Sequence, residues 1–235
     1  MKFTRFVPRL SAALAAAVLV AGATPAAFAD TVTQTKDSQA AITPAIAKQK
    51  LVDGNARFVA GKSLERDYVA QVKQTGAGQF PFAVVLGCID SRVPPELVFD
   101  QGIGDIFAPR IAGNFVNTDI LGSMEFATAV AGARLIVVLG HTKCGAVMGA
   151  CDGVELGNLT QTLSNISPAV YATTTSGERS SKNGEFVEAV ARKNVELTVQ
   201  NILDRSTVIR DLVASGKLEV VGAVHDVTTG KVDFL

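Results

Sequence analysis

The sequence predicts a single α/β domain whose central sheet is mostly parallel, with about four parallel strands and one antiparallel edge strand. Two continuous apolar runs, at 82–87 and 135–140, are typical of strands that are buried on both faces. Segments with apolar residues at helical spacing alternate with such runs, which is the arrangement of a parallel sheet covered by helices. A turn sequence at 228–231 before the last apolar residues indicates a terminal hairpin, which supplies the antiparallel edge.

The first 29 residues have the pattern of a secretory signal peptide and are not expected to belong to the fold. Three basic residues precede an apolar run from 10 to about 22, and the small-x-small sequence Ala27-Phe28-Ala29 follows it. The run is too short to span a bilayer and no later segment is long enough, so no membrane anchor is expected. We expect export through the general secretion route and a periplasmic or secreted mature protein.

The 206 residues that remain suffice for one well-buried domain, expected at 42–235 after a loose polar arm at 30–41. Without the basic residues of the leader, 19 basic residues face 22 acidic ones, a net charge of −3. This balance excludes a strongly basic nucleic-acid-binding protein, and the apolar content excludes a disordered chain.

Helices and strands follow one another along this domain. Thr43 and Pro44 provide an N-cap and a first-turn proline for an amphipathic helix that ends near 59, and a polar helix or loop follows to 78. The spacing of apolar residues predicts further helices at 118–133, at 158–168 and at 185–215, the last broken near 204–207. The other strands are expected at 103–111, 218–224 and 232–235, and a surface loop at 177–184.

Two of the apolar strands end in the same way, in a glycine followed at once by a residue that can bind a metal. The first reads VVLG and then Cys88; the second reads VVLG and then His141, with Cys144 three residues later. Functional residues of open parallel sheets lie beyond the carboxyl ends of the strands, so these three side chains are expected to meet. A Cys/His/Cys set binds zinc, and three protein ligands leave the fourth position open, as in catalytic sites.

Each of these residues alone has a simpler interpretation. A cysteine at a strand end is usually a small buried hydrophobic residue, and a single histidine is usually a hydrogen-bonding one. The repeated context, with the charged Asp90 and Arg92 just after Cys88, favours the zinc site. Three cysteines are a poor disulfide framework for an exported protein. The sequence leaves a Cys88–Cys144 disulfide open and indicates that Cys151 only packs.

The motif Cys-x-Asp-x-Arg at Cys88, Asp90 and Arg92, followed by His-x-x-Cys-Gly at 141–145, resembles the signature of β-class carbonic anhydrases. The resemblance covers most of the mature chain. It implies one zinc ion per subunit, a homodimer that is often doubled to a homotetramer, a helix-flanked sheet with an added antiparallel strand, and reversible hydration of CO2 to bicarbonate. Three further segments are similar to the family: LVDGNARFVAGK (51–62), SRVPPELVFDQGIGD (91–105) and VVGAVHDVTTGKV (220–232).

The chemistry of such a site agrees with these implied roles. Zinc lowers the pKa of bound water from about 15.7 towards 7, which gives a hydroxide that attacks CO2 near neutral pH. Two thiolates cancel the charge of the ion, so a neighbouring group has to compensate. Asp90 is placed to orient the zinc-bound solvent through a hydrogen bond, and Arg92 to hold that carboxylate through a bidentate pair. His225, the other histidine, is a candidate proton relay.

The family has two types of site, and the resemblance favours the type whose fourth zinc position always holds water. Gln79 stands nine residues before Cys88, where that type carries a substrate-binding glutamine. Phe107 and Phe126 match aromatic positions of the substrate pocket, and Gly145 follows the last ligand within the motif. The other type lets the motif aspartate bind the zinc and needs a tryptophan, which this chain lacks.

Two other functions fit parts of the same pattern. A relative on the same scaffold that hydrolyses COS or CS2 would share the zinc site and differ in substrate access. A zinc-storage or redox protein would use Cys88 and Cys144 without turnover, and Asp90 would then be dispensable. The intact set of Gln79, Asp90 and Arg92 favours CO2 as the substrate.

Overall fold

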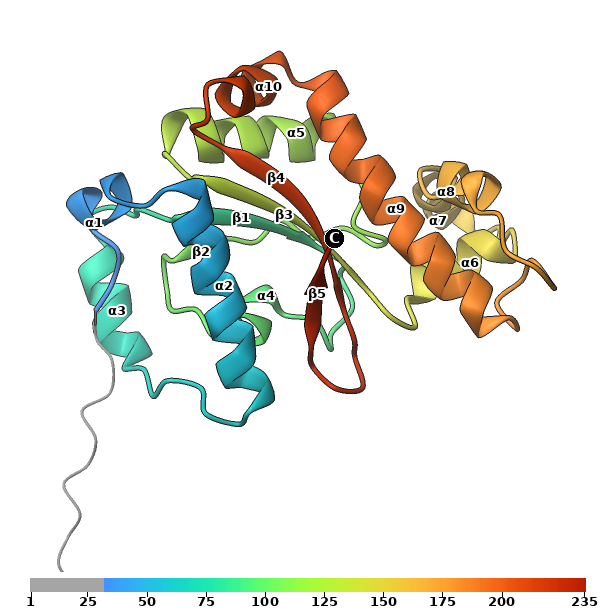
Figure 1. Cartoon of the computed structure of the whole chain (residues 1–235), viewed down its shortest axis with the longest axis horizontal. Coiled ribbons are helices and arrows are strands. Elements are labelled where there is room, and N and C mark those ends of the chain that lie inside the picture. The colour runs from blue at the N-terminus through green and yellow to red at the C-terminus, as the bar shows by residue number, and fades with distance from the viewer. Residues whose placement is uncertain (1–31) are drawn as a thin grey trace, which may run out of the picture.

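The computed structural model describes residues 32–235, so the predicted signal peptide lies outside the described residues. Figure 1 shows a central sheet with helices on both faces. The first four strands are parallel and the last is antiparallel to its neighbour, which confirms the predicted fold class. The strands are β1 (Ala83–Gly87), β2 (Ile106–Phe107), β3 (Leu135–His141), β4 (Glu219–His225) and β5 (Val232–Phe234). Across the sheet they lie in the order β2-β1-β3-β4-β5.

Helices connect the strands, and the long helical pattern predicted at 185–215 breaks where expected, at Ser206, whose side chain caps the helix that follows. Within residues 32–235, no helix combines the length and the apolar character that a membrane crossing requires. The helices are α1 (Lys36–Ala40), α2 (Pro44–Val59), α3 (Tyr68–Thr75), α4 (Pro95–Val98), α5 (Thr118–Glu125), α6 (Gly145–Cys151), α7 (Gly157–Ser164), α8 (Ser167–Ala172), α9 (Gly184–Arg205) and α10 (Thr207–Ala214), with a π-helical turn η1 (Phe126–Val130) after α5.

Each face of the sheet has its own apolar layer. Side chains alternate along a strand, so Val85 and Val137 face one layer, to which α2 contributes Leu51. Val84 and Ile136 face the other layer, which α5, α9 and α10 complete. Both layers bury the two central strands fully, which is the physical reason for their unbroken apolar sequences.

Two glycines of the sheet bring α9 close to it. A Cβ atom at Gly140 would lie 2.5 Å from a methyl group of Val195, and one at Gly222 would lie 2.6 Å from the other methyl group. Contacts this short do not occur between real side chains, so these positions of β3 and β4 require glycine. The close packing places α9 beside the carboxyl end of β3, where His141 lies.

The structure corrects two predictions in the first half of the chain. The segment 30–41, expected to be a loose arm, contains α1, and the buried Gln39 of this helix donates to the carbonyl oxygens of Pro81 (2.7 Å) and Ala131 (2.8 Å). The strand expected at 103–111 is reduced to Ile106–Phe107, with one isolated bridge from Gly87 to Arg110. Pro109 has no N–H to donate, and this interrupts the hydrogen-bond ladder between Ile106–Phe107 and the bridge at Arg110.

Two predicted helices also differ from the structure. The helix expected at 118–133 changes after α5 into η1, where the N–H of Ala131 donates to the carbonyl of Phe126, five residues earlier. The helix expected at 158–168 is two helices, α7 and α8. Pro168 lies in the first turn of α8, where its missing N–H costs nothing, rather than at a helix end.

A buried ion-pair network joins α2 to the loops on either side of the first strand. The Asp100 side chain is 2% exposed and accepts hydrogen bonds from Arg57, from Arg66 and from the N–H of Leu64. Burial acts to raise the pKa of Asp100, but the two guanidinium groups outweigh it and hold the pKa below its usual value.

Replacing this carboxylate without changing its size should destabilise the fold, because it leaves buried guanidinium groups without a counter-charge. We expect Asp100→Asn to lower the free energy of unfolding by about 3 kcal/mol at pH 7, measured by urea denaturation at fixed protein concentration. Since the folded-state pKa of Asp100 lies below its unfolded value, the stabilisation is complete above about pH 4. It is lost as the pH falls through the folded-state pKa, so the difference from wild type should shrink in acid.

The control is Asp233→Asn, which breaks an exposed 2.7 Å pair with Lys231 and should change the free energy of unfolding by less than about 0.5 kcal/mol. Equal effects of the two substitutions at pH 7 would contradict the role given to Asp100.

Candidate metal centre

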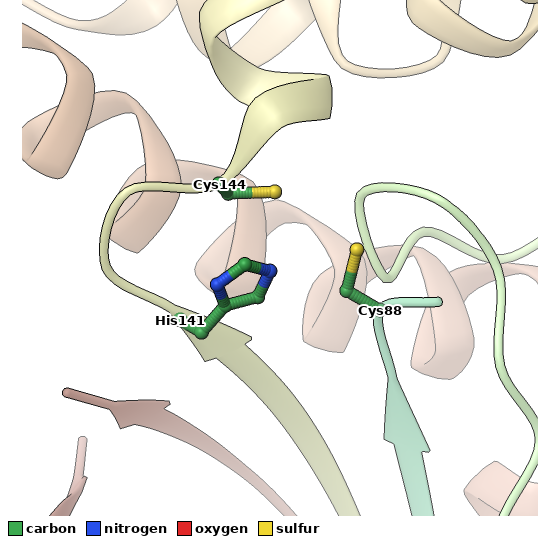
Figure 2. A group of neighbouring side chains, drawn as sticks. All are labelled: Cys88, His141 and Cys144. Atoms are coloured by element: carbon green, nitrogen blue, oxygen red, sulfur yellow. The ribbon is translucent and has the colours of Figure 1, made fainter. Parts of the chain in front are cut away.

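The structure brings the three predicted ligands together at the carboxyl edge of the sheet. Cys88 follows β1, His141 is the last residue of β3, and Cys144 is the N-cap of α6. Their ligand atoms all lie within 4.8 Å of one another, and all three residues are buried. Figure 2 shows the two sulfur atoms and the imidazole ring turned toward one point. The convergence follows from the parallel pairing of β1 and β3, which sets Gly87 opposite Leu139.

The histidine is oriented as a metal ligand. Its Nδ1 lies 2.9 Å from the carbonyl oxygen of Thr142, an arrangement that places the ring proton on Nδ1. Nε2 is then an acceptor; it is buried and has no hydrogen-bond partner within residues 32–235. A buried nitrogen without a partner is costly unless a proton donor or a metal ion meets it, so His141 fits a metal centre.

The two thiols fit the same ion. All three cysteines are free, so the disulfide that the sequence left open between Cys88 and Cys144 is not formed. The closeness of the two sulfur atoms lowers the pKa of Cys88 and raises the pKa of Cys144, so ionisation of one thiol disfavours ionisation of the other. A divalent cation in that place satisfies both as thiolates, and zinc with bonds of about 2.3 Å to sulfur suits the spacing.

The loop that contains Gly113 supports the Cys88 thiol. Gly113 has a φ of +82°, and its N–H lies 3.4 Å from the Cys88 sulfur, to which it donates. A Cβ at this position would lie 2.3 Å from the Ile166 side chain, so the loop requires glycine for space as well as for conformation. Asn194 of α9 holds the loop through a 2.7 Å hydrogen bond to the Gly113 carbonyl.

Asp90 and Arg92 form the predicted bidentate pair. Arg92 Nε donates to Asp90 Oδ1 at 2.9 Å, and a terminal nitrogen donates to Oδ2 at 2.7 Å. Oδ2 also lies 3.9 Å from Nε2 of His141, so the carboxylate stands beside the metal centre. Hydrogen bonding by Arg92 holds the pKa of Asp90 well below its usual range.

Arg110 supports this segment and was missed by the sequence analysis. Its Nε donates to the carbonyl of Cys88 at 2.8 Å, and a terminal nitrogen donates to the carbonyl of Asp90 at 2.5 Å. The guanidinium thus fixes the backbone on both sides of Ile89. No motif marks Arg110, because its role depends on the single bridge that sets it beside Gly87.

The other predicted site residues are divided among different cavities. Gly145 lines a cavity of about 270 Å³ that Cys88 and Asp90 also line. Phe107 and Phe126 line a separate cavity of about 710 Å³, where their rings meet edge to face at 6.4 Å. Gln79 lines a third cavity of about 400 Å³ with residues of the segment 75–78. Within one chain, Gln79, Phe107 and Phe126 therefore do not line the cavity at the metal centre, whereas Gly145 does.

His225 lies beside the metal centre, but it is buried. It is the register partner of His141 in the β3–β4 ladder, and only 2% of it is exposed. Burial lowers the pKa of His225. A neutral imidazole without access to bulk water is a poor proton relay, which argues against the role considered from the sequence. Cys151 packs against the apolar residues around α6, as expected.

Fold and site together define a class of protein. A mostly parallel sheet carries a buried Cys–His–Cys group at its carboxyl edge, with three donors for a catalytic metal and an ion-paired aspartate beside them. This combination is that of a metal-dependent α/β enzyme.

Comparison with known proteins names the family. The sequence model of carbonic anhydrases matches residues 83–232. Carbonic anhydrase 2 of Mycobacterium tuberculosis is 38% identical over 80% of this chain and 91% of its own length. The carbonic anhydrase of Mycolicibacterium smegmatis is 37% identical over 81% of this chain and 93% of its own length. Among solved structures, a tetrameric β-carbonic anhydrase of Sordaria macrospora has a TM-score of 0.59 at 30% identity and covers 70% of this chain and 89% of that one.

The chain belongs to the β-class carbonic anhydrases, and it is an enzyme of the lyase class. The resemblance carried by Cys88, Asp90, Arg92, His141 and Cys144 is thereby confirmed at the level of the family.

Removal of the metal should expose two thiols. We expect the purified protein to hold one zinc ion per chain and a thiol reagent to modify Cys151 alone, slowly, because burial raises the pKa of this thiol to about 11. After chelation, Cys88 and Cys144 should react as well, giving three modified thiols per chain. Mass spectrometry with metal analysis measures both states.

The matched control is Cys151→Ser, which should keep its zinc and show no modification before chelation. Zinc binding that survives Cys144→Ser unchanged would exclude the proposed ligand set.

Proposed function

We propose that this chain hydrates CO2 reversibly to bicarbonate and a proton, with zinc held by Cys88, His141 and Cys144. One observation carries the proposal: the ligand group is buried, and the ion-paired Asp90 carboxylate lies 3.9 Å from the free nitrogen of His141. The chemistry that zinc supplies when bound is a nucleophile made from water near neutral pH.

Asp90 orients the attacking solvent molecule. Arg92 donates to both carboxylate oxygens, but a carboxylate has about four acceptor positions, so Asp90 still accepts a further hydrogen bond. Because its pKa lies well below the usual range, Asp90 is ionised at every pH at which the enzyme works and acts as an acceptor only. Arg92 also engages both carboxylate oxygens of Asp90, which supports the type of site whose open position always holds water.

The walls of the cavity suit a small apolar substrate. Ile89, Ala146 and Leu159 line it together with Gly145, and the glycine leaves space near Cys144. CO2 offers little for polar recognition, so an apolar wall can admit it while it disfavours ordered water. The same wall does not discriminate strongly against COS or CS2, so substrate preference has to be measured directly.

Replacing the aspartate by its amide should separate catalysis from metal binding. We expect Asp90→Asn to lower kcat/KM for CO2 hydration about 10- to 100-fold, because the amide disturbs both the Arg92 pair and the acceptor for solvent. Its zinc content should equal that of wild type, because Asp90 is not a ligand. Stopped-flow hydration with a pH indicator and metal analysis measure the two quantities.

The outcome discriminates among the candidate functions. A zinc-storage protein would have no CO2 hydration to lose, and Asp90→Asn would then leave its only property intact. Faster turnover of COS or CS2 than of CO2 by the wild type would favour the hydrolase alternative. The wild-type activity could also collapse when a mildly alkaline buffer is acidified. That result would favour the other type of site, in which the motif aspartate, Asp90, binds the zinc.

The complete site is formed by two chains of a homodimer, either alone or as one half of a homotetramer. Gln79, Phe107 and Phe126 line cavities other than the one at Cys88, which supports their acting on the site of a second copy. Phe126 is 52% exposed on its own chain, as expected of a residue that a partner covers. The relative from Sordaria macrospora is described as tetrameric.

Mixed dimers test whether Gln79 acts across the interface. We expect Gln79→Ala and Asp90→Asn each to be strongly impaired, whereas co-expression of the two should restore about one quarter of wild-type activity. Random pairing makes about half of the dimers mixed, and each mixed dimer has one site with both residues intact. Purification through two different tags isolates the mixed dimer, and stopped-flow hydration measures it.

No recovery in the mixed dimer would place Gln79 in its own chain's site or outside catalysis. Light scattering on the same samples establishes the number of chains per particle.

The protein is exported, and its leader is removed near residue 29. The basic residues, apolar run and small-x-small sequence of the leader support this proposal. N-terminal sequencing of protein recovered outside the cytoplasm measures the cleavage point, and an intact Met1 in that fraction would contradict it.

A further inference from the structure

The turn between the last two ligands has an uncommon backbone conformation. Lys143, between His141 and Cys144, has a φ of +53°, in the left-handed region that residues other than glycine seldom adopt. This residue reverses the chain between the end of β3 and the start of α6, and so aims both ligands at one point. A conformation of this kind persists only where surrounding groups hold it.

Both peptide groups of Lys143 are held by charged side chains from other elements. Its N–H donates to Glu188 Oε1 of α9 at 2.9 Å, and its carbonyl oxygen accepts from Arg92 at 3.3 Å. The Thr142 half of the turn is held separately, because the Thr142 N–H donates to the carbonyl of His225 at 2.9 Å. Glu188 is thus the anchor for the N–H of the residue with the left-handed backbone.

The same turn helps to position the catalytic pair. The terminal nitrogen of Arg92 that donates to the Lys143 carbonyl also donates to Asp90 Oδ2 at 2.7 Å. The Arg92 side chain is 49% exposed, so contacts with the protein rather than burial have to fix its direction. A rotation of the Lys143 peptide would move its carbonyl away from Arg92 and loosen the hold on Asp90.

The helix that carries Glu188 is fixed in place near the site. Val195 of α9 fits against the two sheet glycines, and Asn194 holds the Gly113 carbonyl at 2.7 Å. Glu188 precedes Val195 by seven residues, which is about two turns of α9. It therefore lies on the part of the helix that extends past the carboxyl end of β3. A carboxylate on a fixed helix is a stable reference for a short turn.

We infer that Glu188 is a positioning residue of this active site: it holds the left-handed peptide between His141 and Cys144 and, through that peptide, orients Arg92 and Asp90. The inference deepens the proposed CO2 hydration and rests on it for the activity measurement alone. Glu188 acts through its acceptor oxygen, so an amide in its place keeps the function and a methyl group does not.

Three variants of α9 test the inference. We expect Glu188→Ala to lower kcat/KM about tenfold and to speed the loss of zinc to a chelator about tenfold, the size of effect typical of groups that hold metal ligands. Glu188→Gln keeps an acceptor oxygen at the same place and should stay within about twofold of wild type in both measurements. Glu196→Ala removes another carboxylate from the same helix, one that pairs with Lys193 at the surface, and should change neither.

A spectroscopic signature and a rescue separate positioning from a loss of stability. The visible spectrum of the cobalt-substituted protein reports ligand geometry and should change in Glu188→Ala but not in Glu188→Gln. Glycine adopts a positive φ without strain, so Lys143→Gly should recover part of the loss when added to Glu188→Ala. The rescue and the amide variant carry the test if Glu188→Ala alone folds poorly.

The inference is overturned if Glu188→Ala keeps the wild-type rate of zinc loss and the wild-type cobalt spectrum. It is also overturned if Glu188→Gln is as impaired as Glu188→Ala, since charge rather than an acceptor would then be the cause. A wild type that binds zinc but hydrates no CO2 refutes the proposed function only. The chelator and cobalt measurements still decide the role of Glu188.

Discussion

The parallel pairing of β1 with β3 is the constraint on which the site depends. Their register sets Gly87 opposite Leu139, so the residue after β1 and the last residue of β3 emerge side by side at one edge of the sheet. The rest of the fold serves this pairing. Apolar layers on both faces keep the central strands free of water, and two glycines let α9 lie close beside their ends. A shift of register by one residue would turn the strands' side chains to the wrong faces and separate the ligands.

Around the ligands, the side chains of Arg92, Arg110 and Glu188 contact groups from different parts of the chain. Arg92 joins Asp90 to the Lys143 turn, Arg110 fixes the backbone at Cys88 and Asp90, and Glu188 joins the turn to α9. The metal centre is therefore held by a network that depends on tertiary structure rather than by the local sequence around each ligand.

The sequence was sufficient for the two central strands, the fold class and the grouping of Cys88, His141 and Cys144, because burial on both faces and the repeated strand-glycine pattern leave clear local signals. It was less informative where tertiary contacts decide. Pro109 shortens β2, and an extra residue per turn converts the end of the 118–133 helix into η1. Arg110 and Glu188 could not be found from the sequence, because neither lies in a motif and each contacts backbone atoms more than 20 residues away. Gln79, Phe107 and Phe126 were named from the resemblance alone, and in one chain they lie in cavities other than that of Cys88.

The contacts between the ligand turn and the end of β4 make the geometry of the centre depend on a distant part of the chain. Thr142 donates to the carbonyl of His225 and accepts from the N–H of Val227 at 3.1 Å, and the Lys143 ammonium reaches Thr228 at the same distance. These partners lie more than 80 residues further along the sequence. Contacts this distant in sequence form slowly, so β4 braces the turn between His141 and Cys144 only through a late pairing of the sheet. The turn that carries two of the candidate ligands therefore reaches its final geometry only after β4 has joined β3.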